Sequence, residues 1–351
     1  MARRQIHTSQ VLAPPLIFAG LFVALWCYKC IMLVLFQNAI IYNPFLPPNA
    51  RSMRIAEFAR QCGGVEWRED RTRSLDGTEI ALCVSEVSCG DERGDSSGPP
   101  RTPVYILYFQ DISGILRQLK AATEGRVHYT MVCLSYRGYW TSHDRPSERG
   151  IDLDSEAALR WISKLHRGRE KGAPVALPGP ITILWGQSIG CGFATNLAAK
   201  AQDDATLPID ALVLETPFTN TRAMLTALYP QKWLPYRHLW PFLRNHLDSW
   251  ANLGLMAAKP RKPGVYIVQA GKDELVPPDH GGILHRRCQA LQLAVELHTV
   301  RGALHNDVMV RREGKHIIAR SIALAVSRAQ EAYGEADQKQ RLPGPPENQE
   351  K

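Results

Sequence analysis

The stretch Ile181–Lys200, ITILWGQSIGCGFATNLAAK, decides the fold of this chain. Its first residues, Ile181–Trp185, form a short apolar run with β-branched members, which is typical of a buried strand. The sequence Gly186–Gly190 (GQSIG) follows at once, and Phe193–Lys200 has the composition of a helix. A strand, a G-x-S-x-G motif and a helix in direct succession predict a sharp turn that exposes the Ser188 hydroxyl above the sheet.

Two interpretations of Ser188 start from this stretch. In one, the hydroxyl is a nucleophile on a strained turn, above a helix N-terminus whose free N–H groups favour developing negative charge. In the other, Ser188 only caps the helix in a glycine-rich turn, because an isolated G-x-S-x-G motif is a weak signal. The remainder of the chain has to separate the two.

On both sides of this stretch, short apolar runs alternate with segments of helical composition. Near-continuous apolar strands separated by helices predict a parallel sheet that is covered on both faces. Asp76-Gly77, between the first two runs, is a hairpin signal. The expected strands are Val65–Arg73, Thr78–Val84, Val104–Phe109, Thr130–Tyr136, Ile181–Trp185, Ala211–Glu215, Val265–Ala270 and Val295–Val300.

The predicted fold class is α/β, with a mostly parallel eight-stranded sheet, helices on both faces and the strand before Ser188 as the fifth. The first hairpin adds an antiparallel edge. Helices are expected at Ile115–Ala122 and Leu153–Lys164, and Leu165–Pro180 is expected to be a loop. Because ligands bind beyond the carboxyl ends of parallel strands, Ser188 lies where a site is expected.

The N-terminal part contains a long apolar run, Leu16–Phe36, in which Lys29 is the one charged residue. A helix that crosses a bilayer needs about 20 such residues, so the run predicts an uncleaved transmembrane anchor. A cleaved signal peptide is the alternative, since Arg3 and Arg4 form a basic start, but no small-x-small cleavage site follows. Basic residues flank both ends of the run, so the orientation in the membrane stays open.

These segments define the expected domain organisation. Residues 1–15 form an N-terminal tail, 16–36 the transmembrane anchor, 37–64 a linker with a short helix, and 65–330 the α/β domain. Within that domain, residues 219–260 are rich in Trp, Tyr, Leu and Pro without a strand pattern, which predicts a helical, lid-like insertion. Residues 331–351 are polar and are expected to be a disordered tail.

Composition argues against several classes of function. The 351 residues carry a net charge of +8, but the basic residues are scattered and form no stripe interleaved with aromatics. Nucleic acid is therefore not an expected partner, and an anionic membrane accounts better for the charge. Metal-ligand spacings, phosphate-binding loops and dinucleotide fingerprints are missing from the sequence, so we expect no metal and no cofactor.

A serine hydroxyl becomes a strong nucleophile only beside a base that a carboxylate orients. Asp273 follows the strand Val265–Ala270 and His305 follows Val295–Val300, so both lie at carboxyl ends of predicted parallel strands, as Ser188 does. This shared edge favours the nucleophile over the cap. Asp273 could still be an ordinary turn residue. The competing acids are Glu215 and Glu274, and the competing bases are His280, His285, His298 and His316.

Several motifs resemble, in their order, those of the α/β-hydrolase superfamily. In detail the chain resembles the membrane-anchored α/β-hydrolase-domain proteins that include the fungal bud-emergence-type family. The most specific parts are SYRGYWTSHDRPSERGIDLDSEAAL, residues 135–159, and the ending GALHND, residues 302–307. The resemblance covers about residues 10–330 and rests on Phe109–Gly114, Tyr136–Gly138, Pro146–Gly150 with Asp154, Gly186–Gly190, Gly271–Pro277 and Gly302–Asp307.

Members of this family resemble serine esterases and thioesterases that act on acyl groups, some of them on lipidated proteins at membranes. The resemblance implies that Ser188 is the nucleophile, Asp273 the acid and His305 the base. It also implies an oxyanion hole made by the backbone N–H groups of Ile112 and Ile189.

The chain departs from the family at the loop after the third strand. The family's loop reads like F-H-G-N-A-G, whereas Phe109–Gly114 reads FQDISG, so Asp111 brings a carboxylate near the developing negative charge. Loss of one oxyanion donor lowers kcat about 100- to 1000-fold, so the expected activity is weak or limited to a narrow range of substrates. Ser135 and Trp140 also replace the family's usual Asp and Gly.

The resulting expectation is a membrane-anchored serine hydrolase that cleaves a carboxylic ester or thioester of an acyl or lipid-like substrate through an acyl-enzyme. The alternative is a catalytically impaired membrane protein of the same fold that acts as a scaffold or binds a lipid or partner. We expect a single-pass protein of the endoplasmic reticulum or another endomembrane, with the plasma membrane as the alternative location. Protein partners are not indicated.

Overall fold

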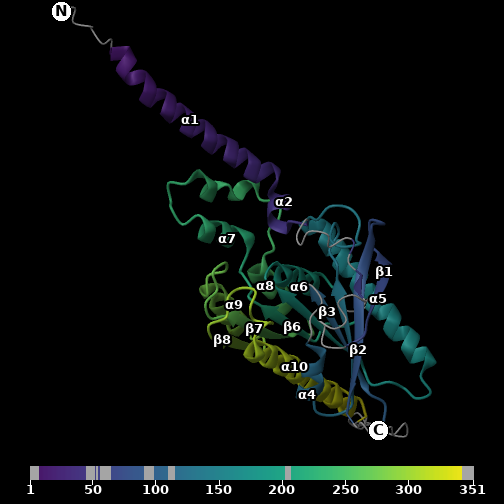
Figure 1. Ribbon diagram of the computed structural model, residues 1–351. Helices are drawn as coiled ribbons and strands as arrows, with labels where there is room; N and C mark the ends of the chain where they lie inside the picture. Colours follow the sequence, from purple (N-terminus) through teal and green to yellow (C-terminus); the bar gives the residue numbers. More distant parts are fainter. Residues whose placement is uncertain are drawn as a thin grey trace, which may run out of the picture.

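One eight-stranded sheet forms the centre of the molecule (Figure 1). The computed structural model describes residues 8–44, 52, 54–55, 65–90, 99–109, 115–201 and 207–341. The strand order is β1-β2-β4-β3-β5-β6-β7-β8. The strands are β1 (Trp67–Arg73), β2 (Glu79–Cys89), β3 (Thr102–Phe109), β4 (Val127–Leu134), β5 (Ile181–Gln187), β6 (Ala211–Glu215), β7 (Gly264–Ala270) and β8 (Val295–Val300).

The sheet is antiparallel only at one edge. β1 pairs with β2 and β2 with β4 in antiparallel register, whereas every pair from β4 to β8 is parallel. Six strands therefore point their carboxyl ends to the same edge. The predicted fold class is confirmed, with eight strands and the strand before Ser188 as the fifth in the chain.

Helices cover both faces of the sheet, as the apolar strands predict. One core cluster joins the sheet to α5, α6, α8 and α9, and the other joins it to α4 and α10. Helix α1 projects from this body, and α2 joins the two (Figure 1). The helices are α1 (Thr8–Leu35), α2 (Gln37–Tyr42), α4 (Leu116–Ala122), α5 (Glu148–Gly172), α6 (Ile189–Lys200), α7 (Thr221–Leu228), η2 (Pro235–His238), η3 (Trp240–Phe242), α8 (Ser249–Ala257), α9 (Asp279–Ala290) and α10 (Arg312–Arg341).

Two helices are longer than the sequence predicts. The expected loop Leu165–Pro180 is wrong in its first half, because α5 continues to Gly172. Leu165 packs against the core, and the buried ring of His166 hydrogen-bonds the Tyr105 hydroxyl at 3.2 Å, which extends the buried face of the helix.

α10 likewise runs on to Arg341, so the disordered tail expected from residue 331 is corrected for residues 331–341. The Tyr333 hydroxyl donates to the Pro180 carbonyl at 3.1 Å, and the Arg261 guanidinium lies 4.4 Å from the Tyr333 ring centroid. Residues 342–351 lie outside the described part of the chain, as do residues 56–64 of the linker.

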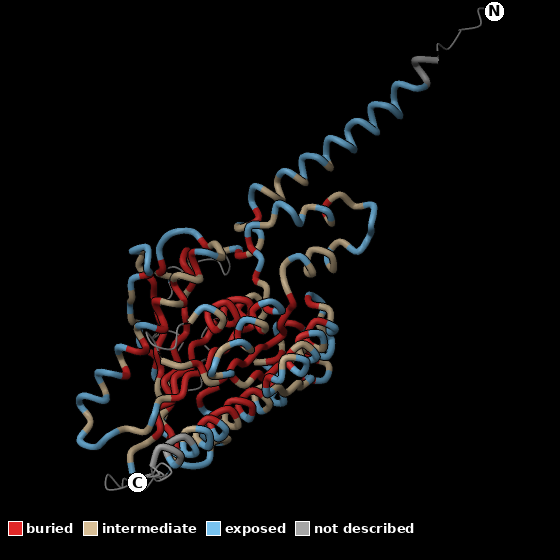
Figure 2. The backbone as a smooth tube through the Cα atoms, turned by 180° about the vertical axis from the view of Figure 1, so that it is seen from behind, coloured by how far each residue is buried: buried red, intermediate tan, exposed pale blue. Residues whose placement is uncertain are grey.

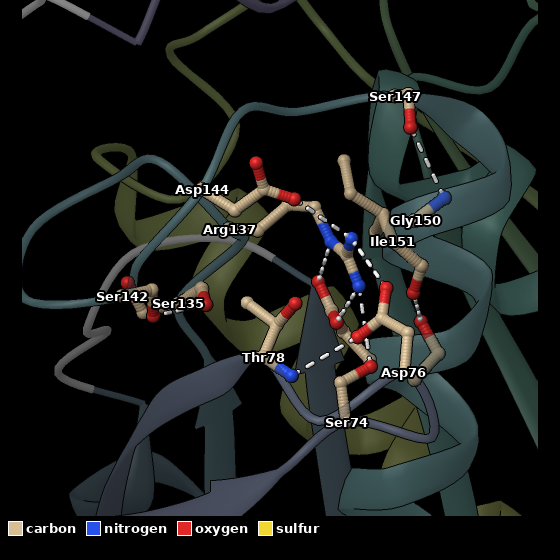
Figure 3. A network of polar contacts seen from close by, with 12 residues as sticks. Ser74, Asp76, Thr78, Ser135, Arg137, Ser142, Asp144, Ser147, Gly150 and Ile151 are labelled. Carbon is tan, nitrogen blue, oxygen red and sulfur yellow. Dashed lines mark hydrogen bonds and ion pairs between the residues drawn. The ribbon is translucent and has the colours of Figure 1, made fainter.

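Arg137 organises the loop between β4 and α5 through a buried network of acidic partners (Figure 3). Its guanidinium binds both oxygens of the fully buried Asp154, at 3.0 and 2.7 Å, and Asp76 at 2.8 Å. Asp144 accepts a longer contact of 3.2 Å at the exposed rim. A Cβ on Gly150 would approach the Arg137 side chain to 2.6 Å, so a larger residue at this position would displace the guanidinium from its partners.

Replacement of Asp154 by alanine is expected to lower the free energy of unfolding by about 3–5 kcal/mol, because it leaves a buried guanidinium without its bidentate partner. Asp144→Ala removes an exposed partner of the same guanidinium and should cost no more than about 1 kcal/mol. Urea unfolding of the two variants in detergent measures the difference. Equal costs would contradict the bidentate pair as the centre of the network.

The core also buries one carboxyl group, on Glu215 at the end of β6. The Trp185 indole N–H donates to one of its oxygens at 3.2 Å, and the other oxygen has no hydrogen-bond partner among the described residues. Burial raises the pKa of Glu215 from its usual 4.5 to about 8, against the smaller lowering effect of the Trp185 hydrogen bond. Glu215 is therefore neutral in the folded protein at pH 7.

Between about pH 4.5 and 8 the folded protein keeps a proton on Glu215 that the unfolded chain releases, so the stability from this group is complete at low pH and falls as pH rises. We expect the free energy of unfolding of Glu215→Gln, relative to that of the wild type, to increase as pH rises. The increase is up to about 1.4 kcal/mol per pH unit across that window. Urea unfolding at pH 5 and pH 8 tests it, with the exposed Glu331→Gln as a control. A difference independent of pH would rule out a neutral Glu215.

Candidate active site

Ser188 stands on a strained turn between β5 and α6. Its backbone φ of +51° lies in the left-handed region, which residues other than glycine rarely adopt. The two glycines of the motif make this turn possible: a Cβ on Gly186 would lie 2.4 Å from the backbone of Gly190, and one on Gly190 would lie 2.3 Å from the Phe109 carbonyl oxygen. The strand and the helix thus approach each other closely at the sharp turn.

The structure brings Ser188, His305 and Asp273 together in one hydrogen-bonded chain. His305 Nε2 lies 2.8 Å from Ser188 Oγ, and His305 Nδ1 lies 3.0 and 2.9 Å from the two oxygens of Asp273. The three residues follow β5, β8 and β7, at the edge where the parallel strands end. This arrangement suits a neutral imidazole that donates to the carboxylate through Nδ1 and accepts the serine proton at Nε2.

Asp273 is held in its charged form. Burial raises the pKa of this carboxyl, but hydrogen bonds from His305 and from the backbone N–H of Val276 outweigh burial and lower the pKa below the usual value. The Leu275 and Val276 N–H groups both donate to Oδ1, at 3.0 and 2.8 Å. The side chains of Asp273 and His305 are only 4% and 3% exposed, so this negative charge acts on the imidazole with little screening by water.

The competing acids and bases lie elsewhere. Glu274 accepts a hydrogen bond from the backbone N–H of His305 at 2.9 Å, so it positions the histidine loop and does not contact the ring. Glu215 hydrogen-bonds the indole of Trp185. His280 is buried against Thr219, whose backbone N–H donates to Nδ1 at 3.1 Å. The role of Glu274 escaped the sequence reasoning, which treated it only as an alternative acid.

Half of the expected oxyanion hole falls within the described residues. Ile189 is the first residue of α6, where a backbone N–H has no acceptor within the helix. Ile112 and Asp111 lie outside the described residues, in the segment 110–114. The Tyr136 hydroxyl donates to the Phe109 carbonyl at 2.9 Å and so supports the strand end from which this segment leaves.

Trp140 stands where the family that the chain resembles has glycine. Its φ is +40°, a conformation that glycine adopts at little cost, and about 1–2 kcal/mol is the usual cost for other residues. The ring packs against the core cluster that includes α4 and α10. Ser135, the other departure, accepts a hydrogen bond from the Ser142 hydroxyl through its carbonyl oxygen at 2.8 Å.

The geometry suits proton transfer from a hydroxyl, because the imidazole lies within hydrogen-bond distance of both the serine oxygen and the carboxylate. Within the described part of the chain, no group of three or more His, Cys, Asp or Glu side chains could hold a metal ion.

Curated proteins of the same type match parts of the chain. It is 34% identical to human protein ABHD12B over 134 residues, which cover 38% of this chain and 33% of that protein. It is 28% identical to protein bem46 of Schizosaccharomyces pombe over 217 residues, 60% of this chain and 64% of that one. It is 44% identical to the zebrafish (Danio rerio) lysophosphatidylserine lipase ABHD12 over 94 residues, 27% and 22% of the two chains. Each match thus spans less than two thirds of the relative's own length.

Solved structures share the fold at low sequence identity, and no protein-family model matches the chain. A bacterial heroin esterase superposes with a TM-score of 0.51 at 18% identity, over 80% of this chain and 91% of that one. The acylaminoacyl peptidase of Pyrococcus horikoshii gives 0.53 at 13% identity, over 79% and 44%. The chain thus has the α/β-hydrolase fold, and its similarity to ABHD12B, bem46 and ABHD12 supports the α/β-hydrolase superfamily.

Proposed function

We propose that this protein is a membrane-anchored serine hydrolase that cleaves a carboxylic ester or thioester through an acyl-enzyme intermediate. The observation that carries the proposal is the hydrogen-bonded chain from Ser188 through His305 to Asp273. The strained backbone at Ser188 supports it, because this conformation exposes the hydroxyl at the edge where the strands end.

In the proposed reaction, Ser188 Oγ attacks the carbonyl carbon of the substrate and its proton passes to His305 Nε2. The Asp273 carboxylate stabilises the imidazolium that forms. The Ile189 N–H, with the Ile112 N–H as the proposed second donor, binds the oxyanion. The intermediate collapses as His305 protonates the leaving alcohol or thiol. Water, deprotonated by His305, then attacks the acyl-enzyme, and the acid leaves as Ser188 regains its proton.

A lipid-like acyl substrate fits the surroundings of the site. Leu275 and Leu304, which are close in sequence to Asp273 and His305, are exposed apolar side chains. The relative ABHD12 is named a lysophosphatidylserine lipase. We therefore extend the proposal to acyl groups of lipids or lipidated molecules, as the class of substrate.

The proposal places the protein in a membrane through α1. The segment Leu12–Leu35 of this helix is long and apolar enough to cross a bilayer, and its most apolar window has no buried residue. We propose a single-pass protein of the endoplasmic reticulum or another endomembrane.

A second candidate is a scaffold of the same fold with an impaired oxyanion hole. The observation that favours it is Asp111, which follows β3 in the sequence at a position where the family that the chain resembles has glycine. The hydrogen-bonded Ser188, His305 and Asp273 favour the enzyme.

We expect a fluorophosphonate probe to label the wild type at Ser188, because the His305 imidazole activates that hydroxyl. Ser188→Ala should abolish labelling and lower ester turnover at least about 1000-fold. Ser327→Ala, on the exposed face of α10, should leave both unchanged. Labelling of Ser188→Ala at the wild-type level, or an unlabelled wild type beside a labelled hydrolase standard, would refute the proposed nucleophile.

Substitution of Asp111 separates the enzyme from the scaffold. For an enzyme, Asp111→Gly should raise kcat about fivefold, since two like charges at close range repel by about 1 kcal/mol in water. Asp111→Asn removes the charge and keeps the shape, so it should act like Asp111→Gly. Steady-state hydrolysis of p-nitrophenyl esters measures both. A wild type without turnover that gains it only in Asp111→Gly would support the scaffold instead.

A further inference from the structure

Residues 221–244, here called the arm, lie beside the C-terminal half of α1 and contain α7, η2 and η3 (Figure 1). The ring centroids of Trp26 on α1 and Trp233 in the arm are 5.7 Å apart. The arm is thus in contact with the helix that we propose as the membrane anchor, about 200 residues away in sequence.

The single charge in the apolar run of α1 lies against aromatic rings of the arm. Lys29 Nζ lies 4.4 Å from the ring centroid of Tyr236 and 5.7 Å from that of Tyr229. A lysine that faces the hydrocarbon of a bilayer is costly, whereas an ammonium over aromatic faces is stabilised. The arm therefore supplies the environment that the helix needs at the depth of Lys29.

Polar contacts hold the arm at a fixed height on α1. Arg244 Nη2 donates to the carbonyl oxygens of Val34 and Leu35 at 2.9 and 3.0 Å. Gln37 accepts from the Arg244 backbone N–H at 2.8 Å and donates to the Phe242 carbonyl at 3.0 Å. These bonds satisfy carbonyl groups that a helix end otherwise leaves free.

The arm exposes large apolar side chains next to this helix. Trp233 is 67% exposed although it touches Trp26, and α1 itself is exposed almost throughout (Figure 2). Clusters of exposed aromatic and aliphatic side chains mark contact surfaces. The exposed members in the arm are Leu228, Trp233, Trp240 and Phe242.

The charge of the arm has one sign. From Thr216 to Leu247 the sequence contains four lysines and arginines and no aspartate or glutamate. Arg222 lies over the exposed ring of Trp240, 3.9 Å from its centroid, so a cation and an indole share one place on the surface. Anionic lipid attracts such residues by about 1 kcal/mol each. The four basic residues are Arg222, Lys232, Arg237 and Arg244.

The height of the arm along α1 agrees with a membrane interface. Trp26 lies nine residues before the end of α1, about 13 Å at 1.5 Å per residue. The apolar segment Leu12–Leu35 has 24 residues, and about 20 suffice to cross the hydrocarbon core. With the four residues beyond those 20 placed outside the core at this end, Trp26 and the ring of Trp233 beside it lie about 7 Å inside the apolar boundary. This is within the range of about 5–10 Å that interfacial helices reach.

We infer that the arm is a second membrane-contacting element, which inserts Trp233 and its apolar neighbours into the leaflet that holds the C-terminal half of α1. Its basic residues lie at the level of the anionic headgroups. The occupant of this surface is the lipid bilayer itself. The inference rests on α1 crossing the membrane, as proposed above, and holds whether or not Ser188 reacts.

Docking of the arm would also fix the candidate site relative to the bilayer. The buried Tyr42 at the end of α2 stacks on Phe193 of α6 at 6.3 Å, and its hydroxyl donates to Asn245 Oδ1 at 2.8 Å. α6 begins directly after Ser188. One set of packed contacts thus joins α6 to the end of the anchor and to the residue that follows the arm. These contacts set the height of Ser188 above the leaflet.

Site-specific photocrosslinking tests lipid contact without relying on catalysis. The full chain, with p-benzoylphenylalanine in place of Trp233, is reconstituted into vesicles of phosphatidylcholine and phosphatidylserine and irradiated. The lipid adduct is quantified by mass. We expect at least about tenfold more adduct than at Val175, because burial of an indole favours contact by more than 1.4 kcal/mol. Val175 is an equally exposed apolar residue, in the loop beyond the end of α5 that points away from α1 (Figure 1).

Phe18 on α1 is the positive control for a residue within the bilayer. Adduct at Phe18 and Trp233 but not at Val175 supports the inference. Adduct at Phe18 alone, at neither position, or a crosslink from Trp233 to a second copy of the protein would overturn it. Lys232→Glu in the Trp233-labelled chain should lower the phosphatidylserine adduct severalfold and spare the phosphatidylcholine adduct. Fluorophosphonate labelling of the same samples reports separately on the proposed reaction.

Discussion

The close approach of β5 and α6 is the constraint on which the candidate site depends. Gly190 lies so near the Phe109 carbonyl that no side chain fits there, and Gly186 lies equally near Gly190. This contact forces the backbone of Ser188 into the left-handed region and lifts its hydroxyl above the sheet. The sheet and two core clusters offset the strain, because both flanking elements are buried over nearly their whole length.

Three buried carboxyl groups of this domain differ in their partners. Asp154 and Asp273 accept hydrogen bonds from charged or backbone donors, whereas Glu215 is protonated and neutral. Arg137 and Asp154 form a bidentate pair that holds the loop after β4. Asp273 keeps its charge because backbone N–H groups and His305 donate to it. Glu215 lacks such donors, and its carboxyl is protonated instead. Hydrogen bonds to the Asp273 carboxylate thus outweigh the effect of burial on its pKa, whereas the one hydrogen bond to Glu215 does not.

Local sequence signals predicted the sheet well and the helix ends poorly. Strands such as Ile181–Gln187 are short and mostly apolar, so their existence follows from composition alone. The ends of α5 and α10 depend on partners far along the chain, since His166 meets Tyr105 and Tyr333 meets Pro180. Such contacts leave no periodic pattern in the local sequence. The end of α5 is rich in Arg and Gly and therefore indicated a loop, and the polar end of α10 indicated disorder.

By itself, the sequence determined the class of fold, the turn at Ser188 and the edge at which Asp273 and His305 lie, because strand ends follow from apolar runs and parallel strands share one direction. Only the tertiary structure decided which acid meets the imidazole. Asp273 and Glu274 are neighbours in the chain, yet one binds the ring of His305 and the other its backbone. The same holds for Lys29 and the arm, since a contact between segments about 200 residues apart depends on packing that no local pattern records.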